Sequence, residues 1–331
     1  MPRRHQGDVR SVRGRVNTKL SLARTSARRR GPVPYGRRRI RTAVVGAVLA
    51  VAALAGCTGS PAPRTGAAAS TGPTPTPTPT PTPVSLWDDS PASVAAVGDS
   101  VTRAFDACSL LADCPEASWA TGTDPAVNSL ALRLLGPGRV AGNSWNLARS
   151  GARVAALPEQ MGRAAARRPE LVTVMIGAND ACRPTPAGMT PVAEFRRSFE
   201  ASLARLRKDA PKARVYVASV PDLRRLWDTG RANPLVRRVW ELGVCGAMLA
   251  DPEDLGSAAE RRRTAVRDRV VAYNEVLAEV CARDERCRYD GGAVFGFRFD
   301  ESLLSTWDWF HPSREGQARL AELAYRRITE K

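Results

Sequence analysis

The sequence predicts an α/β protein with a central, mostly parallel sheet of about five strands and helices on both of its faces. From about residue 90 onward, short apolar runs alternate with longer segments whose apolar residues recur at helical spacing. Strands that alternate with helices form parallel sheets, because each helical crossover returns the chain to the same edge of the sheet. About 240 residues make one domain of ordinary size.

The predicted strands are short, mostly apolar segments bounded by turn-forming residues. They comprise residues 94–97, 139–143, 171–176, 214–220 and a weaker segment near 288–289. Ligands of parallel α/β proteins bind at the carboxyl ends of the strands. Polar residues that directly follow these segments are therefore the first candidates for a functional site.

Three longer segments are predicted to be amphipathic helices, at residues 191–208, 257–281 and 313–328. In the first, Thr190 is expected to cap the helix and Pro191 to lie in its first turn. Its apolar residues recur every three or four positions, as in a helix that packs one face against a sheet.

A candidate nucleophile and its partners stand near opposite ends of this region. Gly98-Asp99-Ser100 follows the first strand, so the Ser100 hydroxyl is expected at a strand tip. His311 is the only histidine beyond residue 5, and Asp308 precedes it by three residues. An imidazole oriented by a carboxylate is the base that activates a serine near neutral pH. We therefore expect Ser100, His311 and Asp308 to meet in the fold.

Two further segments supply hydrogen-bond donors at the same edge of the sheet. The third predicted strand ends in Gly177-Ala-Asn179-Asp180, which offers the Asn179 amide. Gly151 follows another strand-to-loop passage and offers a main-chain N–H with no side chain in the way. Such donors stabilise the oxyanion that forms during acyl transfer.

Four short motifs follow one another along the chain: Gly98-Asp99-Ser100, Gly151, Gly177-Ala-Asn179-Asp180 and Asp308-x-x-His311. In this order they resemble the motifs of the SGNH hydrolases, also called GDSL esterases and lipases. Their sequences are most similar to those of bacterial secreted esterases and phospholipase B-like members. The resemblance covers residues 92–327 and departs from Gly-Asp-Ser-Leu only in having Val101. It implies a three-layer, flavodoxin-like SGNH hydrolase fold for a catalytic domain at residues 91–331.

The resemblance also implies a role for each matching residue. Ser100 would be the nucleophile, His311 the base and Asp308 its partner. The Ser100 N–H, the Gly151 N–H and the Asn179 side chain would form the oxyanion hole. The implied enzyme is a carboxylic ester hydrolase that needs no cofactor.

The strongly positive charge of the chain does not indicate nucleic-acid binding. The formal net charge is +17, but residues 1–56 hold fourteen basic residues and one acidic residue. The remainder therefore carries only +4, without a basic face interleaved with aromatic residues.

The N-terminal region is predicted to direct export. Residues 1–56 form an Arg-rich leader with an apolar run of about fifteen residues, too short for a membrane span, which needs roughly 20. Leu54-Ala-Gly-Cys57 is similar to a lipobox, so we expect lipidation at Cys57. An ordinary signal peptide is the alternative. The length of the leader fits either a start codon placed too far upstream or twin-arginine export.

Residues 57–90 contain the lipidation site and a Thr-Pro-rich linker. Alternating proline favours extended polyproline II structure, so the linker is expected to act as a semi-rigid stalk. Its threonines are candidate sites of glycosylation. The expected location is the extracellular face of the cell membrane, or the medium if the chain is released.

Six cysteines remain beyond Cys57, and an even number in an exported chain indicates disulfides. Two short-range pairs, Cys108–Cys114 and Cys281–Cys287, would leave Cys182 to join Cys245. That last bridge would pin the loop after Asn179. Buried free thiols are the alternative, and no metal site is expected because a single histidine is available beyond the leader.

The substrate is the least determined part of the prediction. Lipid or phospholipid esters fit a membrane-anchored enzyme, and acetylated polysaccharide fits a stalked one. Trp307, Trp309 and Phe310 would line an acyl groove or belong to the core. A non-catalytic surface-binding lipoprotein is a third possibility. We expect a monomer whose partners are a small ester and, through the anchor, the membrane.

Overall fold

The computed structural model describes residues 87–330 of the chain. The predicted leader, the Cys57 lipidation site and all but the last residues of the linker lie outside them. None of the helices described between residues 87 and 330 combines the length and apolar composition that crossing a membrane requires.

The five strands form one parallel sheet in the order β2-β1-β3-β4-β5. They are β1 (Val94–Gly98), β2 (Ser144–Asn146), β3 (Leu171–Met175), β4 (Arg214–Val217) and β5 (Cys287–Tyr289). This is the flavodoxin-like order, in which the chain direction across the sheet switches between β1 and β3. The predicted fold class is confirmed.

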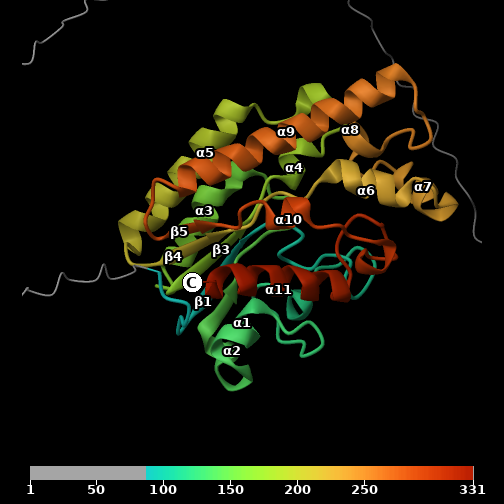
Figure 1. Ribbon diagram of the computed structural model, residues 1–331. Helices are drawn as coiled ribbons and strands as arrows, with labels where there is room; N and C mark the ends of the chain where they lie inside the picture. The colour runs from blue at the N-terminus through green and yellow to red at the C-terminus, as the bar shows by residue number, and fades with distance from the viewer. Residues whose placement is uncertain (1–86, 331) are drawn as a thin grey trace, which may run out of the picture. The chain divides into compact units, whose positions relative to one another are not determined.

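Helices cover both faces of the sheet (Figure 1). The α-helices are α1 (Leu130–Leu135), α2 (Pro137–Asn143), α3 (Leu157–Ala165), α4 (Ala178–Ala181), α5 (Val192–Asp209), α6 (Leu223–Gly230), α7 (Pro234–Trp240), α8 (Gly246–Leu249), α9 (Ser257–Cys281), α10 (Ala293–Gly296) and α11 (Arg314–Thr329). Short 3₁₀ turns are η1 (Pro115–Ala117), η2 (Val154–Ala156), η3 (Pro186–Gly188) and η4 (Glu301–Leu303). In Figure 1, α3, α5 and α9 lie on one side of the sheet, and α1, α2 and α11 lie on the other.

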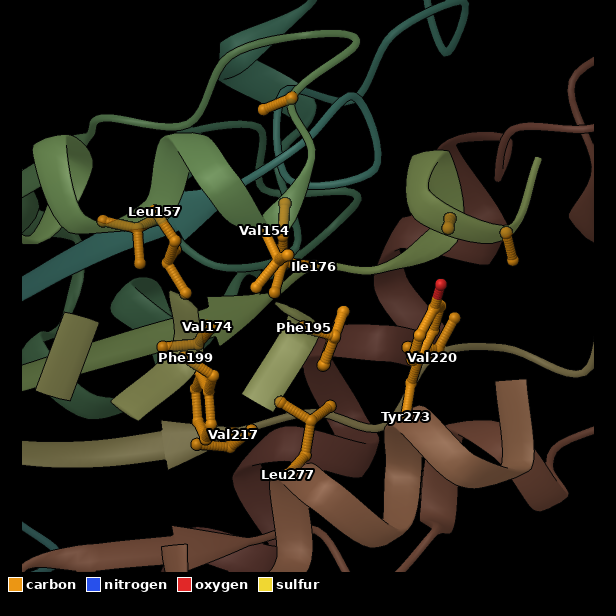
Figure 2. Close-up of a cluster of buried hydrophobic side chains, with 14 of the residues drawn as sticks. Val154, Leu157, Val174, Ile176, Phe195, Phe199, Val217, Val220, Tyr273 and Leu277 are labelled. Carbon is orange, nitrogen blue, oxygen red and sulfur yellow. The ribbon is translucent and has the colours of Figure 1, made fainter. Parts of the chain in front are cut away.

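The larger core lies between the sheet and the α3, α5 and α9 layer. Phe195 and Phe199 of α5 are fully buried, as are Val174 of β3, Val217 of β4 and Leu277 of α9. Figure 2 shows these side chains meeting between the strands and the helices. Each fully buried side chain of this size contributes about 1.5–3 kcal/mol relative to its exposed state. The apolar residues that recur at helical spacing in α5 and α9 thus pack these two helices against the sheet.

A second core lies on the opposite face, where α11 packs beside α1. Leu320 and Ile328 of α11 are at most 1 % exposed and contact the same buried cluster as Val94 and Ala96 of β1. Alternate residues of β1 therefore face the two layers, as the two-residue period of a strand requires. Because α11 packs against β1, the residues just before α11, which include Asp308 and His311, are held near the end of β1.

Two details of the predicted secondary structure are wrong. Residues 139–143 belong to α2, and the strand begins only at Ser144. Gly136 and Pro137 begin the helix, and the apolar residues Val140 and Ala141 alone do not distinguish a helix from a strand. Thr190 does not cap α5. Its hydroxyl donates instead to Asp180 at 2.7 Å, and Pro191 occupies the N-cap position.

Candidate active site

Ser100 lies in the turn that directly follows β1, at the carboxyl end of the sheet. The turn requires glycine at position 98, where φ is +148° and a Cβ would lie 2.2 Å from the Met175 carbonyl oxygen. The buried Gln160 side chain of α3 accepts from the Gly98 N–H at 2.7 Å and donates to its carbonyl at 2.9 Å. Sequence reasoning missed Gln160, which fixes the backbone that presents Ser100.

The structure brings the His311 ring between Ser100 and Asp308. Its Nε2 lies 2.8 Å from the Ser100 Oγ, and its Nδ1 lies 2.5 Å from the Asp308 Oδ2. The other Asp308 oxygen accepts from the main-chain N–H groups of Phe310 and His311, at 2.9 and 3.0 Å. The carboxylate is therefore fixed by its own turn, and the ring is held in line with the hydroxyl.

The electrostatics of this turn favour an ionised Asp308. Burial raises the pKa of the Asp308 carboxyl, but the hydrogen bond and the charge of the His311 ring, together with the two main-chain N–H groups, outweigh it and lower the pKa. Asp99, beside the serine, is only 1 % exposed, and burial raises its pKa to about 7. The N–H of Val101 donates to Asp99, which opposes that rise.

The loops that carry Gly151 and Asn179 are tied to each other. The Asn179 Nδ2 donates to the Ala152 carbonyl at 3.1 Å, and the Val154 N–H donates to the Asp180 Oδ2 at 2.9 Å. Asp180 is fully buried, and its second oxygen accepts from the Thr190 hydroxyl. Asp180 thus joins three segments around the site, a role that sequence reasoning missed.

Two main-chain donors at this edge are free of protein acceptors. Within residues 87–330, neither the Ser100 N–H nor the Gly151 N–H forms a hydrogen bond with another protein atom. A Cβ at Gly151 would meet nothing within 4 Å, so the space beside its amide is open. Because polar main-chain groups normally find partners, these two N–H groups are available to a ligand or to water.

An apolar pocket adjoins this site. Its lining includes Val101, Ala178 and Phe310, which directly adjoin Ser100, Asn179 and His311 in the sequence. It also includes Leu226 of α6, Phe297, Phe299 and Leu304, and Leu304 pairs with Pro312. Of the three aromatic residues considered for an acyl groove, Phe310 lines this pocket, whereas Trp307 lines a separate hollow and Trp309 packs against the larger core.

Potential metal ligands come together at two places in the described part of the chain. Cys108 and Cys114 lie beside Glu116, but both sulfurs are joined in a disulfide. Asp106 lies beside Asp308 and His311, where the His311 Nδ1 already contacts Asp308.

The structure contains three disulfides, Cys108–Cys114, Cys182–Cys245 and Cys281–Cys287, which are the pairs expected from the sequence. Cys182 is the C-cap residue of α4, the short helix that carries Asn179. Cys245 directly precedes α8. The second bridge therefore links the helix that presents Asn179 to the segment between α7 and α8.

We expect the double substitution Cys182→Ala and Cys245→Ala to lower both the melting temperature and the turnover of esters. This bridge spans 63 positions, for which chain entropy predicts a stabilisation of about 4 kcal/mol. The Cys281→Ala and Cys287→Ala variant is the matched control, because its bridge spans six positions and should contribute about 2 kcal/mol. Calorimetry and initial rates measure both, and an unchanged turnover in the first variant would contradict a link to Asn179.

The strand order and the polar groups at the ends of β1 and β3 define a flavodoxin-like α/β protein with a candidate site at the carboxyl edge of its sheet. The model of the family described as GDSL-like Lipase/Acylhydrolase matches residues 94–324. The chain therefore belongs to the GDSL-like lipase and acylhydrolase family, which makes it a carboxylic ester hydrolase at the general level.

Solved structures that match the chain include esterases and lipases. Phospholipase A1 from Streptomyces albidoflavus is 23 % identical, with 70 % of this chain and 97 % of that chain covered and a TM-score of 0.43. An acetyl-xylooligosaccharide esterase from Geobacillus is 18 % identical, with 72 % and 94 % covered and a TM-score of 0.43. An extracellular lipase from Streptomyces rimosus is 18 % identical, with 70 % and 97 % covered and a TM-score of 0.40. No curated protein matched the chain.

Proposed function

We propose that the protein is a serine esterase in which Ser100 attacks the carbonyl carbon of a carboxylic ester. The observation that carries this proposal is the 2.8 Å distance between the His311 Nε2 and the Ser100 Oγ, with Asp308 on the other ring nitrogen. His311 takes the Ser100 proton as the new C–O bond forms. It then gives this proton to the departing alcohol as the ester bond breaks, which leaves an acyl-enzyme.

The same groups serve the second half of the reaction. Water donates a proton to the His311 Nε2 and attacks the acyl-enzyme, after which Ser100 recovers its proton and the acid leaves. The negative charge that develops on the carbonyl oxygen in both halves is stabilised by the Ser100 N–H, the Gly151 N–H and the Asn179 amide. The first two N–H groups have no acceptor among residues 87–330, which supports this assignment.

The apolar pocket supports an acyl chain longer than acetyl. Its lining is mostly apolar and includes Leu226, Phe297, Phe299 and Phe310. Apolar walls favour the hydrocarbon of a longer acyl chain, because each further methylene that is buried there leaves water. We assign the substrate to aliphatic esters of the lipid or phospholipid class, and acetylated polysaccharide is the alternative.

Export to the membrane surface remains part of this proposal. The three disulfides support an oxidising compartment, because structural disulfides persist mainly outside the cytosol. Lipidation of Cys57 would place the enzyme at the membrane, next to lipid esters. Proteomic detection of a lipidated Cys57 peptide in membranes tests this assignment.

The substrate proposal is tested with p-nitrophenyl esters of increasing chain length, a phospholipid and acetyl-xylan. We expect kcat/KM to rise at least tenfold from acetyl to hexanoyl, since each buried methylene contributes about 0.8 kcal/mol. Leu226→Trp should remove this rise by filling part of the pocket, while hydrolysis of the acetyl ester persists. Leu235→Trp is the control, because Leu235 is 66 % exposed on α7. Activity that peaks at acetyl, or on acetyl-xylan, would favour the deacetylase instead.

A further inference from the structure

A second buried carboxyl group lies beside Asp308 and His311. One carboxyl oxygen each of Asp106 and Asp308 and one ring nitrogen of His311 all lie within 4.8 Å of one another. Asp106 is 2 % exposed and Asp308 is 9 % exposed. Two carboxylates that share a buried site repel each other, so a proton is retained on one of them to a higher pH than usual.

Asp106 is fixed in this position by its surroundings. Its Oδ1 accepts from the Leu111 N–H at 2.5 Å, and its own N–H donates to the Ala112 carbonyl. Its carbonyl accepts from the Ser305 hydroxyl at 2.7 Å, while the Ser305 N–H donates to the His311 carbonyl at 2.8 Å. Ser305 therefore joins the loop of Asp106 to the turn of Asp308 and His311.

No cation neutralises Asp106 within the part of the chain that the structure describes. Glu301, Arg314 and Glu315 line the same hollow as Asp106. The Arg314 guanidinium forms its ion pair with Asp124, at 3.5 Å, and not with Asp106. The charged groups that act on Asp106 are thus Asp308 and His311, which contact each other, while Arg314 in the same hollow pairs with Asp124.

The surroundings of the two carboxyl groups move their pKa values in opposite directions. Burial and the neighbouring Asp308 charge raise the pKa of Asp106, against the opposing effects of the Leu111 N–H and of His311. The contacts of Asp308 with His311 act in the opposite direction and lower the pKa of Asp308. The Asp308 carboxylate accepts hydrogen bonds from two main-chain N–H groups, whereas the Asp106 carboxyl accepts one.

We propose that Asp106 is a positioning residue for the proposed esterase: a neutral carboxylic acid that donates its proton in a hydrogen bond to the Asp308 carboxylate. This bond would hold Asp308 against the His311 Nδ1. It would also keep Asp106 from adding a second negative charge beside Asp308. The inference rests on the proposed function of Ser100, His311 and Asp308.

The first test compares Asp106→Ala with Asp106→Asn. The alanine variant loses the donor, and we expect kcat to fall on the order of tenfold with little change in KM. The asparagine variant keeps a donor of the same shape and tolerates the positive φ of +59° at this position, so it should restore most of the lost turnover. Equal losses in the two variants, at equal melting temperatures, would overturn the proposal.

The second test reads the ionisation state by NMR titration of the His311 ring in the full-length protein, with His311→Ala used to assign its signal. If Asp106 is neutral, Asp106→Asn leaves the His311 titration unchanged. If Asp106 is ionised, the substitution removes a negative charge near the ring, so the ring signals of the variant change at lower pH than those of the wild type, which would overturn the proposal. This readout needs no turnover, so it is informative even where no ester is hydrolysed.

The third test is a double-mutant cycle with Asp308→Asn. In that variant Asp106 loses its charged neighbour, ionises and supplies a negative charge near His311. Asp308→Asn should therefore impair the enzyme without abolishing its activity, and adding Asp106→Asn should cost roughly a further tenfold beyond the product of the single effects. Additive effects would contradict the shared proton. Activity that is lost to EDTA and restored by Zn²⁺ would contradict it too, because a metal would then occupy the three groups.

Discussion

Replacing Ser100 with alanine should lower kcat for a p-nitrophenyl ester by on the order of 10⁴- to 10⁶-fold while the fold persists. The side chain is 7 % exposed, and the structure gives its hydroxyl one polar contact, with the His311 Nε2. Its loss removes the nucleophile and leaves only the His311 Nε2 without its protein partner. Stopped assays at high enzyme concentration measure the residual rate, and circular dichroism melting checks the fold.

His311→Ala should cost a similar factor, and the double variant should be hardly worse than either single one, because nucleophile and base act as a unit. Ser150→Ala is the matched control for the serine. The Ser150 hydroxyl lies beside Gly151 but donates to Asp113, so its removal should change kcat less than about threefold. If Ser100→Ala kept more than one per cent of the wild-type rate, the assignment of the nucleophile would be wrong.

The parts of the structure that follow from local pattern were predictable. The strands at β1, β3 and β4 stand out because their residues are apolar and bounded by turn formers, and α9 begins and ends where its periodicity does. The polar residues after β1 and β3 then fall at one edge of the sheet for topological reasons alone. The proximity of Ser100 and Asn179 follows from this placement, without knowledge of any side-chain contact.

The contacts that hold the site together were not predictable from the sequence. Gln160 lies 62 positions from Gly98, on a helix face whose other buried members are apolar, and nothing local marks it as the partner of a turn. Thr190 carries the local signature of a helix cap, yet its hydroxyl bonds to Asp180 because tertiary structure supplies a buried carboxylate. Asp106 similarly appears as an ordinary loop residue until the fold places it beside Asp308.

Replacing Asn179 with alanine should lower kcat by about 10²- to 10³-fold and change KM much less. The Asn179 side chain is held at the end of β3 by its bond to the Ala152 carbonyl, 3.1 Å away, so its remaining N–H has a fixed direction. A donor fixed in this way interacts most strongly with the charge of the transition state, which is why turnover suffers more than substrate binding. Steady-state kinetics on the preferred ester measures both constants.

Two further variants separate this effect from a loss of structure. Asn179→Asp keeps the size of the side chain but places a negative charge next to the developing oxyanion, so it should be at least as slow as the alanine variant. Asn146→Ala is the control, since the Asn146 amide donates to the Thr102 carbonyl and the Ser118 hydroxyl and should affect stability more than turnover. If Asn179→Ala instead raised KM with kcat unchanged, the amide would bind ground state and transition state equally, and the oxyanion hole would consist of the two main-chain N–H groups alone.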